Sequence, residues 1–131
     1  MAYYADLTKY TYIRWTGVHN ALNVGWLDEA IPFPTGEVPQ AVIDKLAVLC
    51  SHATMITRGF HLCPFCPSDE TAAGNGEIRV VGKGSVVYAA PSLLHHYIAQ
   101  HNYRPPDEFL AALDASPIEV HLSEIKRWDL F

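Results

Sequence analysis

The spacing of apolar residues predicts one well-defined helix in the first half of the chain. Its apolar positions recur at helical spacing and are Val42, Ile43, Leu46, Leu49 and Cys50. Pro39 suits the first helical turn, where the missing N–H would have no partner within the helix. We therefore predict a helix over residues 39–50. Cys50 lies on its apolar face and is interpreted as a small core residue rather than a metal ligand.

Before this helix the pattern is shorter and more aromatic. Tyr10–Trp15 alternates and is rich in strand-forming residues, which predicts a short strand. Ala21–Leu27 is a second apolar segment, either a strand with a bulge at Gly25 or a loop that buries Trp26. Residues 31–36 contain two prolines and a glycine, which predicts a rigid connector without regular structure.

A β-hairpin is predicted in the second half of the chain. Glu77–Val81 and Ser85–Tyr88 are both rich in strand formers. The segment between them contains Gly82 and Gly84, and glycine readily adopts the positive φ that a tight turn requires. The two strands should therefore pair in antiparallel fashion.

Two helices and a final strand are predicted after the hairpin. The first helix begins at residue 91 or 92 and runs to about His101, and the second begins near Pro106 with acidic residues in its first turn. Ile118–Leu122 alternates like a strand. With 131 residues, the chain is expected to form one domain over residues 1–131. This order of elements predicts an α+β fold.

Composition and charge narrow the possible environments and partners. Half of the residues are hydrophobic and 18% are charged, which is typical of a globular protein. No apolar run approaches the roughly 20 residues of a membrane helix, and the first residues lack the pattern of a secretory signal, so a cytoplasmic location without membrane contact is expected. The net charge of −5 argues against nucleic-acid binding and favours a protein partner.

The cysteines suggest a metal site. There are three, an odd number that does not suit a disulfide scaffold, and Cys63 and Cys66 are separated by two residues on a proline-containing turn. Two thiolates at this spacing can bind one tetrahedral zinc ion, with Zn–S distances of about 2.3 Å. We predict a structural Zn²⁺ ion bound by Cys63, Cys66, His96 and His101. A zinc-knuckle turn, a hairpin and a helix in this order are similar to a treble-clef arrangement.

The choice of histidines is less constrained than the choice of cysteines. His96 and His101 are about 140° apart around an ideal helix, so we expect the helix end to loosen if both bind one ion. His61, next to the turn, is the strongest substitute ligand, and His95 is another.

Two other interpretations treat the cysteines as thiols. Cys63–Cys66 resembles the Cys-Pro-aromatic-Cys turn of glutaredoxins, whose first cysteine lies at a helix N-terminus. Here Pro67 follows at once, and a polar loop containing glycines comes next. Alternatively both cysteines are buried core residues, although a proline-rich turn with polar neighbours is a poor core segment.

A catalytic zinc site is the remaining alternative. His61, Cys63 and Cys66 would bind the ion and leave one position open for water, with Glu70 or Glu77 as a base, as in a zinc hydrolase. Short cysteine turns are more typical of closed structural sites. The sequence therefore favours a non-enzymatic, zinc-stabilised binding or accessory module.

Several segments resemble one known group of proteins. They are residues 23–27, 58–66 and 88–98, the last continuing through residues 101–109. Together they resemble a family of small uncharacterised bacterial proteins, some of them carried as mobile integron gene cassettes. The resemblance implies that the cysteine turn and the helix bearing His96 and His101 belong to one unit. It implies no particular activity.

Overall fold

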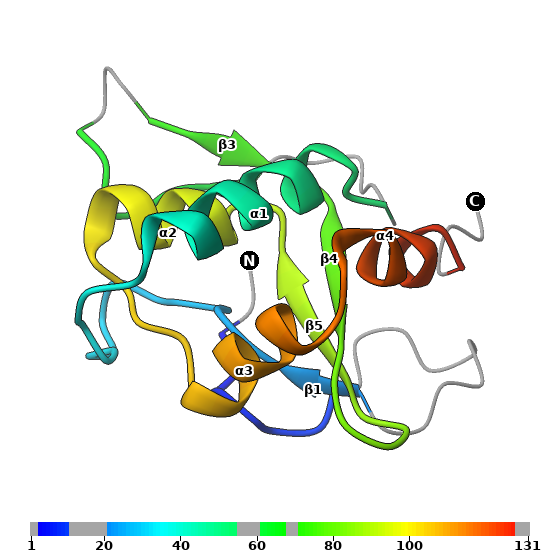
Figure 1. Cartoon of the computed structure of the whole chain (residues 1–131). Helices are drawn as coiled ribbons and strands as arrows, with labels where there is room; N and C mark the ends of the chain where they lie inside the picture. The colour runs from blue at the N-terminus through cyan, green and yellow to red at the C-terminus, as the bar shows by residue number, and fades with distance from the viewer. Residues whose placement is uncertain (1–2, 11–20, 55–60, 68–70, 128–131) are drawn as a thin grey trace.

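The computed structural model describes residues 3–10, 21–54, 61–67 and 71–127, which form an α+β fold (Figure 1). All but the first residue of the predicted strand Tyr10–Trp15 therefore lies outside the described residues. The elements are β1 (Ala21–Asn23), α1 (Gln40–Ser51), β2 (His61–Leu62), β3 (Ala73–Gly74), β4 (Glu77–Val81), β5 (Val87–Pro91), α2 (Leu94–His101), α3 (Asp107–Ala115) and α4 (Ile118–Arg127).

The larger sheet has the strand order β1-β5-β4, with β5 in the centre. β5 runs parallel to β1 and antiparallel to β4, which confirms the predicted hairpin. The second strand of the hairpin starts two residues later than predicted, because residues 82–86 form a wider turn closed by a hydrogen bond from the Gly82 N–H to the Val86 carbonyl (2.9 Å). Gly84 adopts a φ of 63° in this turn.

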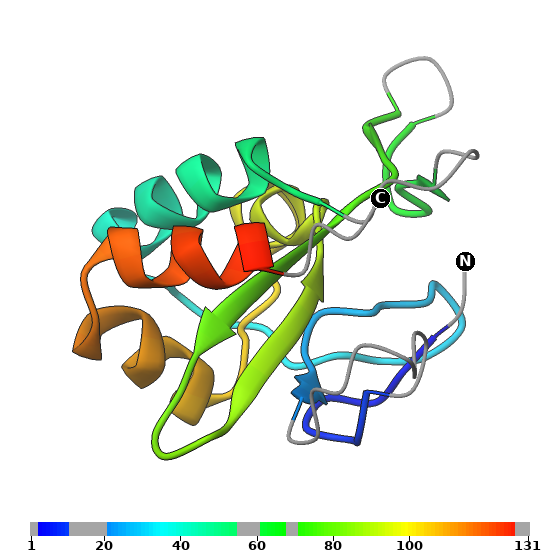
Figure 2. The same cartoon turned by 90° about the vertical axis from the view of Figure 1, so that its right-hand side faces the viewer.

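The two faces of the sheet bury different side chains because successive residues of a strand point to opposite sides. Ile78 and Val80 face α1, α3 and α4, and belong to the main hydrophobic core. Ala89 belongs to a smaller cluster on the other face, together with Tyr10, Ala21 and Trp26. Figure 2 shows the helices gathered on one side of β4 and β5 and the N-terminal segment on the other side.

The segment around Gly25 is a loop that buries Trp26, which decides between the two predicted alternatives. β1 ends at Asn23, and Gly25 has a φ of 81°. A Cβ atom at Gly25 would lie 2.6 Å from Leu94 Cδ1, so glycine is required here by space as well as by conformation. The Trp26 indole N–H donates to the Ala89 carbonyl (3.0 Å) and ties the loop to the central strand.

The predicted helices in the middle of the chain are confirmed, but the predicted final strand is wrong. Residues 118–122 form the first half of α4. Residues two apart lie about 200° apart around a helix, so the alternation does not mark the buried side of α4. Val120 is 39% exposed, and the residues that α4 buries, His121 and Ile125, are four apart. His121 was counted as polar in the strand pattern, whereas its side chain is fully buried.

Helix lengths bear on the membrane question. None of the helices in the described part of the chain combines the length and apolar character needed to cross a membrane.

Candidate metal centre

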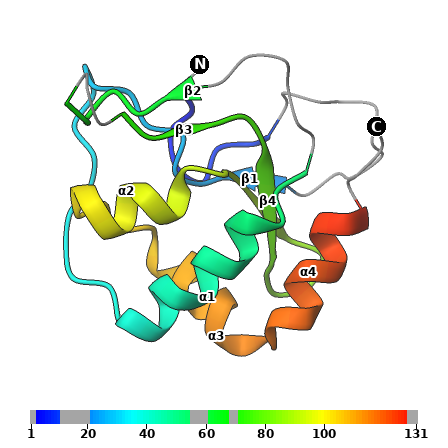
Figure 3. The ribbon, with the colours of Figure 1, turned by 90° about the horizontal axis from the view of Figure 1, so that it is seen from above.

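The cysteine turn is held by a short two-stranded ladder. β2 pairs with β3 in antiparallel register, and the Cys63 N–H donates to the Ala72 carbonyl (2.8 Å) just beyond the ladder. These contacts close the chain into a knuckle, which we define as residues 61–67. Figure 3 shows the β2–β3 region lying beside α2. The backbone thus presents both cysteine side chains towards that helix.

Helix α2 supplies the two histidines, His96 in its first turn and His101 as its last residue. The helix stays regular through His101, and the next residue, Asn102, adopts a left-handed conformation with a φ of 59°. The N–H groups of Asn102 and Tyr103 both donate to the Tyr97 carbonyl, which satisfies the helix end. The helix therefore does not loosen before His101, contrary to the expectation. Although the two residues lie on different sides of the helix, their distal Nε2 atoms come within 3.2 Å of each other.

The structure brings together the four side chains named from the sequence. The ligand atoms of Cys63, Cys66, His96 and His101 all lie within 4.8 Å of one another. Cys66 Sγ is 3.1 Å from His96 Nε2, and Cys63 Sγ is 3.4 Å from His101 Nε2. The two Nε2 atoms are 3.2 Å apart.

These separations suit a tetrahedral metal centre. With Zn–S bonds of about 2.3 Å and Zn–N bonds of about 2.0–2.1 Å, a tetrahedron places sulfur and nitrogen about 3.5 Å apart and two nitrogens about 3.3 Å apart. The distances from Cys66 Sγ to both Nε2 atoms, from Cys63 Sγ to His101 Nε2 and between the two Nε2 atoms lie within a few tenths of an ångström of these values. The cluster could therefore hold a metal ion in the space between the four ligand atoms.

Burial shapes the protonation of the site. Cys63 is only 2% exposed, and burial raises the pKa of its thiol. Burial also lowers the pKa of His96, and the neighbouring His101 and His95 lower it further. His96 can therefore bind a metal as a neutral imidazole, whereas the Cys63 thiol would lose its proton when a cation binds. Metal binding at this site would release protons from sulfur.

Phe65, at the tip of the knuckle, anchors the turn to the protein. Its ring centroid lies 5.3 Å from that of Phe33, 5.9 Å from that of Tyr97 and 5.5 Å from that of His101. These rings pack at steep or tilted angles, as aromatic pairs prefer. One side chain of the turn therefore fixes the position of a ligand on α2, a role that the sequence alone did not reveal. A phenylalanine between the two cysteines of the turn is the signal that points to it.

The substitute ligands lie outside the cluster. Among the described residues, the group of side chains placed to share a metal includes neither His61, which lies in β2, nor His95. Cys50 is also separate, and burial raises the pKa of its thiol to about 11. It packs against the main core, as expected from its position on the apolar side of α1.

A thiol-exchange centre is not favoured by this geometry. An attacking cysteine in a redox turn has a lowered pKa and lies at the N-terminus of a helix. The pKa of Cys63 is raised instead, and β3 is the next element along the described chain.

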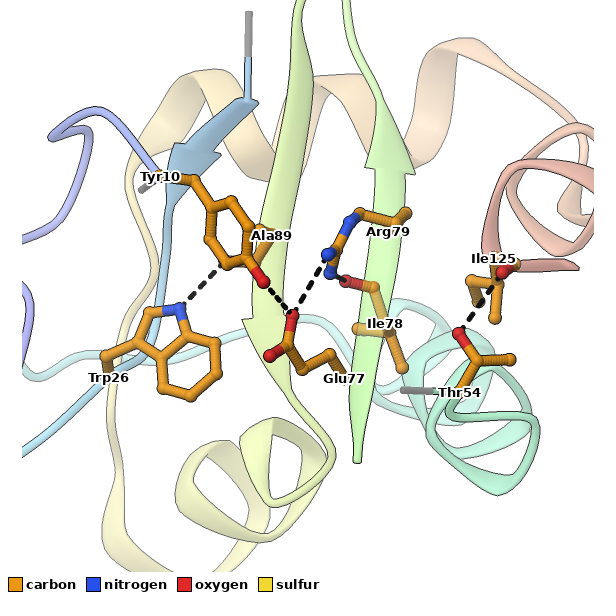
Figure 4. A network of polar contacts seen from close by, with 8 residues as sticks. All are labelled: Tyr10, Trp26, Thr54, Glu77, Ile78, Arg79, Ala89 and Ile125. Carbon is orange, nitrogen blue, oxygen red and sulfur yellow. Dashed lines mark hydrogen bonds and ion pairs between the residues drawn. The ribbon is translucent and has the colours of Figure 1, made fainter. Parts of the chain in front are cut away.

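Glu77 is unsuited to act as a base at the cluster. Its Oε1 accepts a hydrogen bond from the Tyr10 hydroxyl (2.8 Å) and pairs with Arg79 Nη2 (2.9 Å). Figure 4 shows this buried network beside β4, with the Arg79 guanidinium also donating to the Ile78 carbonyl. Glu70, the other candidate base, lies outside the described residues.

Comparison with known proteins assigns the chain to a family. The family model "Domain of unknown function (DUF7919)" matches residues 2–114. The chain belongs to this family. No curated protein and no solved structure matches it. The DUF7919 match covers every residue of the cluster and ends within α3, so α4 lies beyond it. The predicted resemblance to an uncharacterised family is confirmed, whereas the bacterial origin and the gene cassettes stay predictions.

Proposed function

We propose that this member of the DUF7919 family is a small binding or accessory module stabilised by one structural zinc ion. The observation that carries the proposal is the convergence of two cysteine sulfurs and two imidazole nitrogens within 4.8 Å. Zinc is the metal that this donor set favours, because two thiolates and two imidazoles in a tetrahedron suit a borderline-soft ion without a geometric preference of its own.

A structural role follows from the number of ligands. Four protein ligands complete a tetrahedral shell and leave no position for water, as in closed structural zinc sites. The ion would join the knuckle to both ends of α2, and 30 residues separate Cys66 from His96. In the described part of the chain, the knuckle is held by a two-residue ladder, by hydrogen bonds at Cys63 and Pro67 and by the packing of Phe65. A shared cation would therefore be the strongest interaction between the knuckle and α2.

The proposed partner is another protein in the cytoplasm. A net charge of −5 disfavours the phosphate backbone of nucleic acids, and a small domain with a closed metal site has no open coordination position for a substrate. The resemblance to small bacterial proteins carried on integron cassettes fits an accessory role of this kind. Binding to duplex DNA at low salt, measured by fluorescence anisotropy, would contradict the choice of partner.

Metal analysis tests the zinc site directly. Protein purified without added metal should contain about one zinc per chain. A strong chelator should remove the ion and lower the melting temperature, and added Zn²⁺ should restore both. Protein that is metal-free as isolated and binds no added Zn²⁺ would overturn the proposal.

Neighbouring histidines provide a matched test of the ligand set. His96→Ala should lose most of the zinc and melt at a lower temperature, because only three ligands remain. His95→Ala removes an imidazole next to the site without removing a ligand, so its zinc content should stay near one per chain. If His96→Ala keeps its zinc while His61→Ala loses it, the proposed ligand set is wrong.

A further inference from the structure

His121 occupies an unusual position at the edge of the larger sheet. It projects from α4, the helix that lies beyond the family match, and its side chain is fully buried. Its Nδ1 atom accepts a hydrogen bond from the Val81 N–H of β4 (3.0 Å). A side chain of a helix thus serves as a partner for the backbone of an edge strand.

The ladder between β4 and β5 explains why this amide needs a partner. Hydrogen bonds at Gly76–Ser92 and Gly82–Val86 show that even-numbered residues face β5. The backbone groups of Glu77 and Val81 consequently point away from β5, towards the open edge. Glu77 exchanges two backbone hydrogen bonds with Thr54 (2.8 and 2.9 Å), whereas the outward N–H of Val81 is satisfied by the imidazole. An unsatisfied edge amide in this partly buried position would be unfavourable.

The hydrogen bond determines the protonation state of the ring. Because Nδ1 accepts, the single ring proton must lie on Nε2. Nε2 is buried and has no hydrogen-bond partner among the described residues. The carbonyls of Leu113 and Ser116 lie near the ring and accept hydrogen bonds from the Lys45 ammonium of α1. The Lys45 ammonium is a charged group that acts on the ring.

We propose that α4 is a latch on the edge of β4 that opens when His121 takes up a proton at Nδ1. The added proton turns the acceptor into a donor that faces the Val81 N–H, so the hydrogen bond is lost. It also places a positive charge in the core next to Lys45. Another side-chain hydrogen bond between α4 and the body, which does not involve His121, joins Thr54 Oγ1 to the Ile125 carbonyl (3.2 Å). Opening would expose the outer edge of β4 and leave the rest of the sheet paired.

The direction of the pH response follows from the surroundings of the ring. Burial lowers the pKa of His121 below its usual value of 6.5, Lys45 lowers it further, and the carbonyls of Leu113 and Ser116 oppose this effect in part. An opened or unfolded state therefore binds the proton more tightly than the closed state. The latch is fully closed above about pH 6.5 and weakens as the pH falls below that value.

Amide hydrogen exchange on the zinc-loaded full chain tests the latch. Between pH 7.5 and pH 5.5, the protection factor of the Val81 amide should fall about tenfold more than that of the Val80 amide, which faces β5. His121→Asn places a non-titrating oxygen close to the position of Nδ1. In this variant the Val81 amide should stay protected at pH 7.5. Between pH 7.5 and pH 5.5 its protection factor should fall no more than that of the Val80 amide. His52→Asn, at the exposed end of α1, should behave like the unmodified protein.

Several results would overturn the proposal. Equal loss of protection at Val80 and Val81 would indicate global opening, for example through loss of zinc, rather than release of α4. An extra fall that persists in His121→Asn would show that another group titrates. Nitrogen-15 shifts of the His121 ring in the unmodified protein give a second measurement that does not depend on any variant. A ring that stays neutral while the Val81 amide loses protection would exclude the latch.

Discussion

Two polar sites, one buried and one partly buried, lie in different parts of this molecule and differ in how their charges are balanced. Beside β4, Glu77 is neutralised by Arg79 and accepts the Tyr10 hydroxyl, and the Arg79 guanidinium lies 4.8 Å from the centre of the Tyr10 ring. In the metal centre, two sulfurs and two imidazole nitrogens face one another without a cationic side chain among them. The first site contains its own opposite charges, whereas the second could hold a metal cation from outside.

This difference separates sites that stabilise the fold by themselves from a site that depends on an ion. A paired charge is costly to disturb, because removal of one partner leaves the other buried and unpaired. Removal of one side chain from a set of metal ligands is costly only if the ion is bound. The four predictions below test this contrast, from the largest expected effect to the smallest.

Cys63→Ser should have the largest effect. A serine hydroxyl is a poor zinc ligand, so zinc content should fall below about one-tenth of an ion per chain, and the melting temperature should fall by about 10 °C or more. Metal analysis and differential scanning calorimetry measure both. The control Cys50→Ser should keep its zinc, because Cys50 lies outside the cluster. An unchanged zinc content in Cys63→Ser would contradict the ligand assignment.

Glu77→Gln should destabilise the protein by about 3–5 kcal/mol without changing its zinc content, because Arg79, which is 1% exposed, loses its counter-charge. Urea unfolding of the zinc-loaded protein measures the loss. The double variant Glu77→Gln/Arg79→Met should regain a large part of it. Asp107→Asn breaks the exposed ion pair with Arg104 and should cost less than about 1 kcal/mol. If Glu77→Gln and Asp107→Asn lower the free energy of unfolding equally, burial does not set the contribution of these ion pairs.

Phe65→Leu probes the link between core packing and the metal centre. Loss of the ring contacts with Phe33, Tyr97 and His101 should lower the free energy of unfolding by about 1–2 kcal/mol. Zinc should still bind, but a chelator should remove it faster. Phe33→Leu is the matched control, since Phe33 contacts Phe65 and Tyr103 but no proposed ligand in the described ring contacts. Its zinc release should change less than that of Phe65→Leu.

Two phenol–carboxylate hydrogen bonds allow the finest comparison. Tyr10 donates to Glu77 in the buried network (2.8 Å), and Tyr88 donates to the exposed Glu108 (2.7 Å). Tyr10→Phe should cost about 2–3 kcal/mol because it withdraws a donor from a buried charge, and Tyr88→Phe about 1 kcal/mol. Urea unfolding gives both values. The reverse order would show that burial does not control the strength of these bonds.

Much of the local structure could be predicted from the sequence because it depends on nearby residues. The helical spacing after Pro39, the glycine turn of the hairpin and the acidic first turn of α3 all act within a few residues. The predicted strand at Ile118–Leu122 is wrong because five residues are too few to establish a period of two, and the residues that α4 buries, His121 and Ile125, follow helical spacing instead. The Glu77–Arg79 pair was missed, although opposite charges two residues apart on a predicted strand share a face and could have indicated it.

The sequence by itself determined which residues can bind a metal, because the donor chemistry of cysteine and histidine and the spacing of Cys63 and Cys66 are local properties. Only the tertiary structure decided that His96 and His101 meet them while His61 and His95 do not, since that choice depends on how α2 lies against the knuckle. It also placed Tyr10 on Glu77, 67 residues away, and His121 on the edge of β4. Contacts over such distances follow from the packing of whole elements, which no short stretch of sequence specifies.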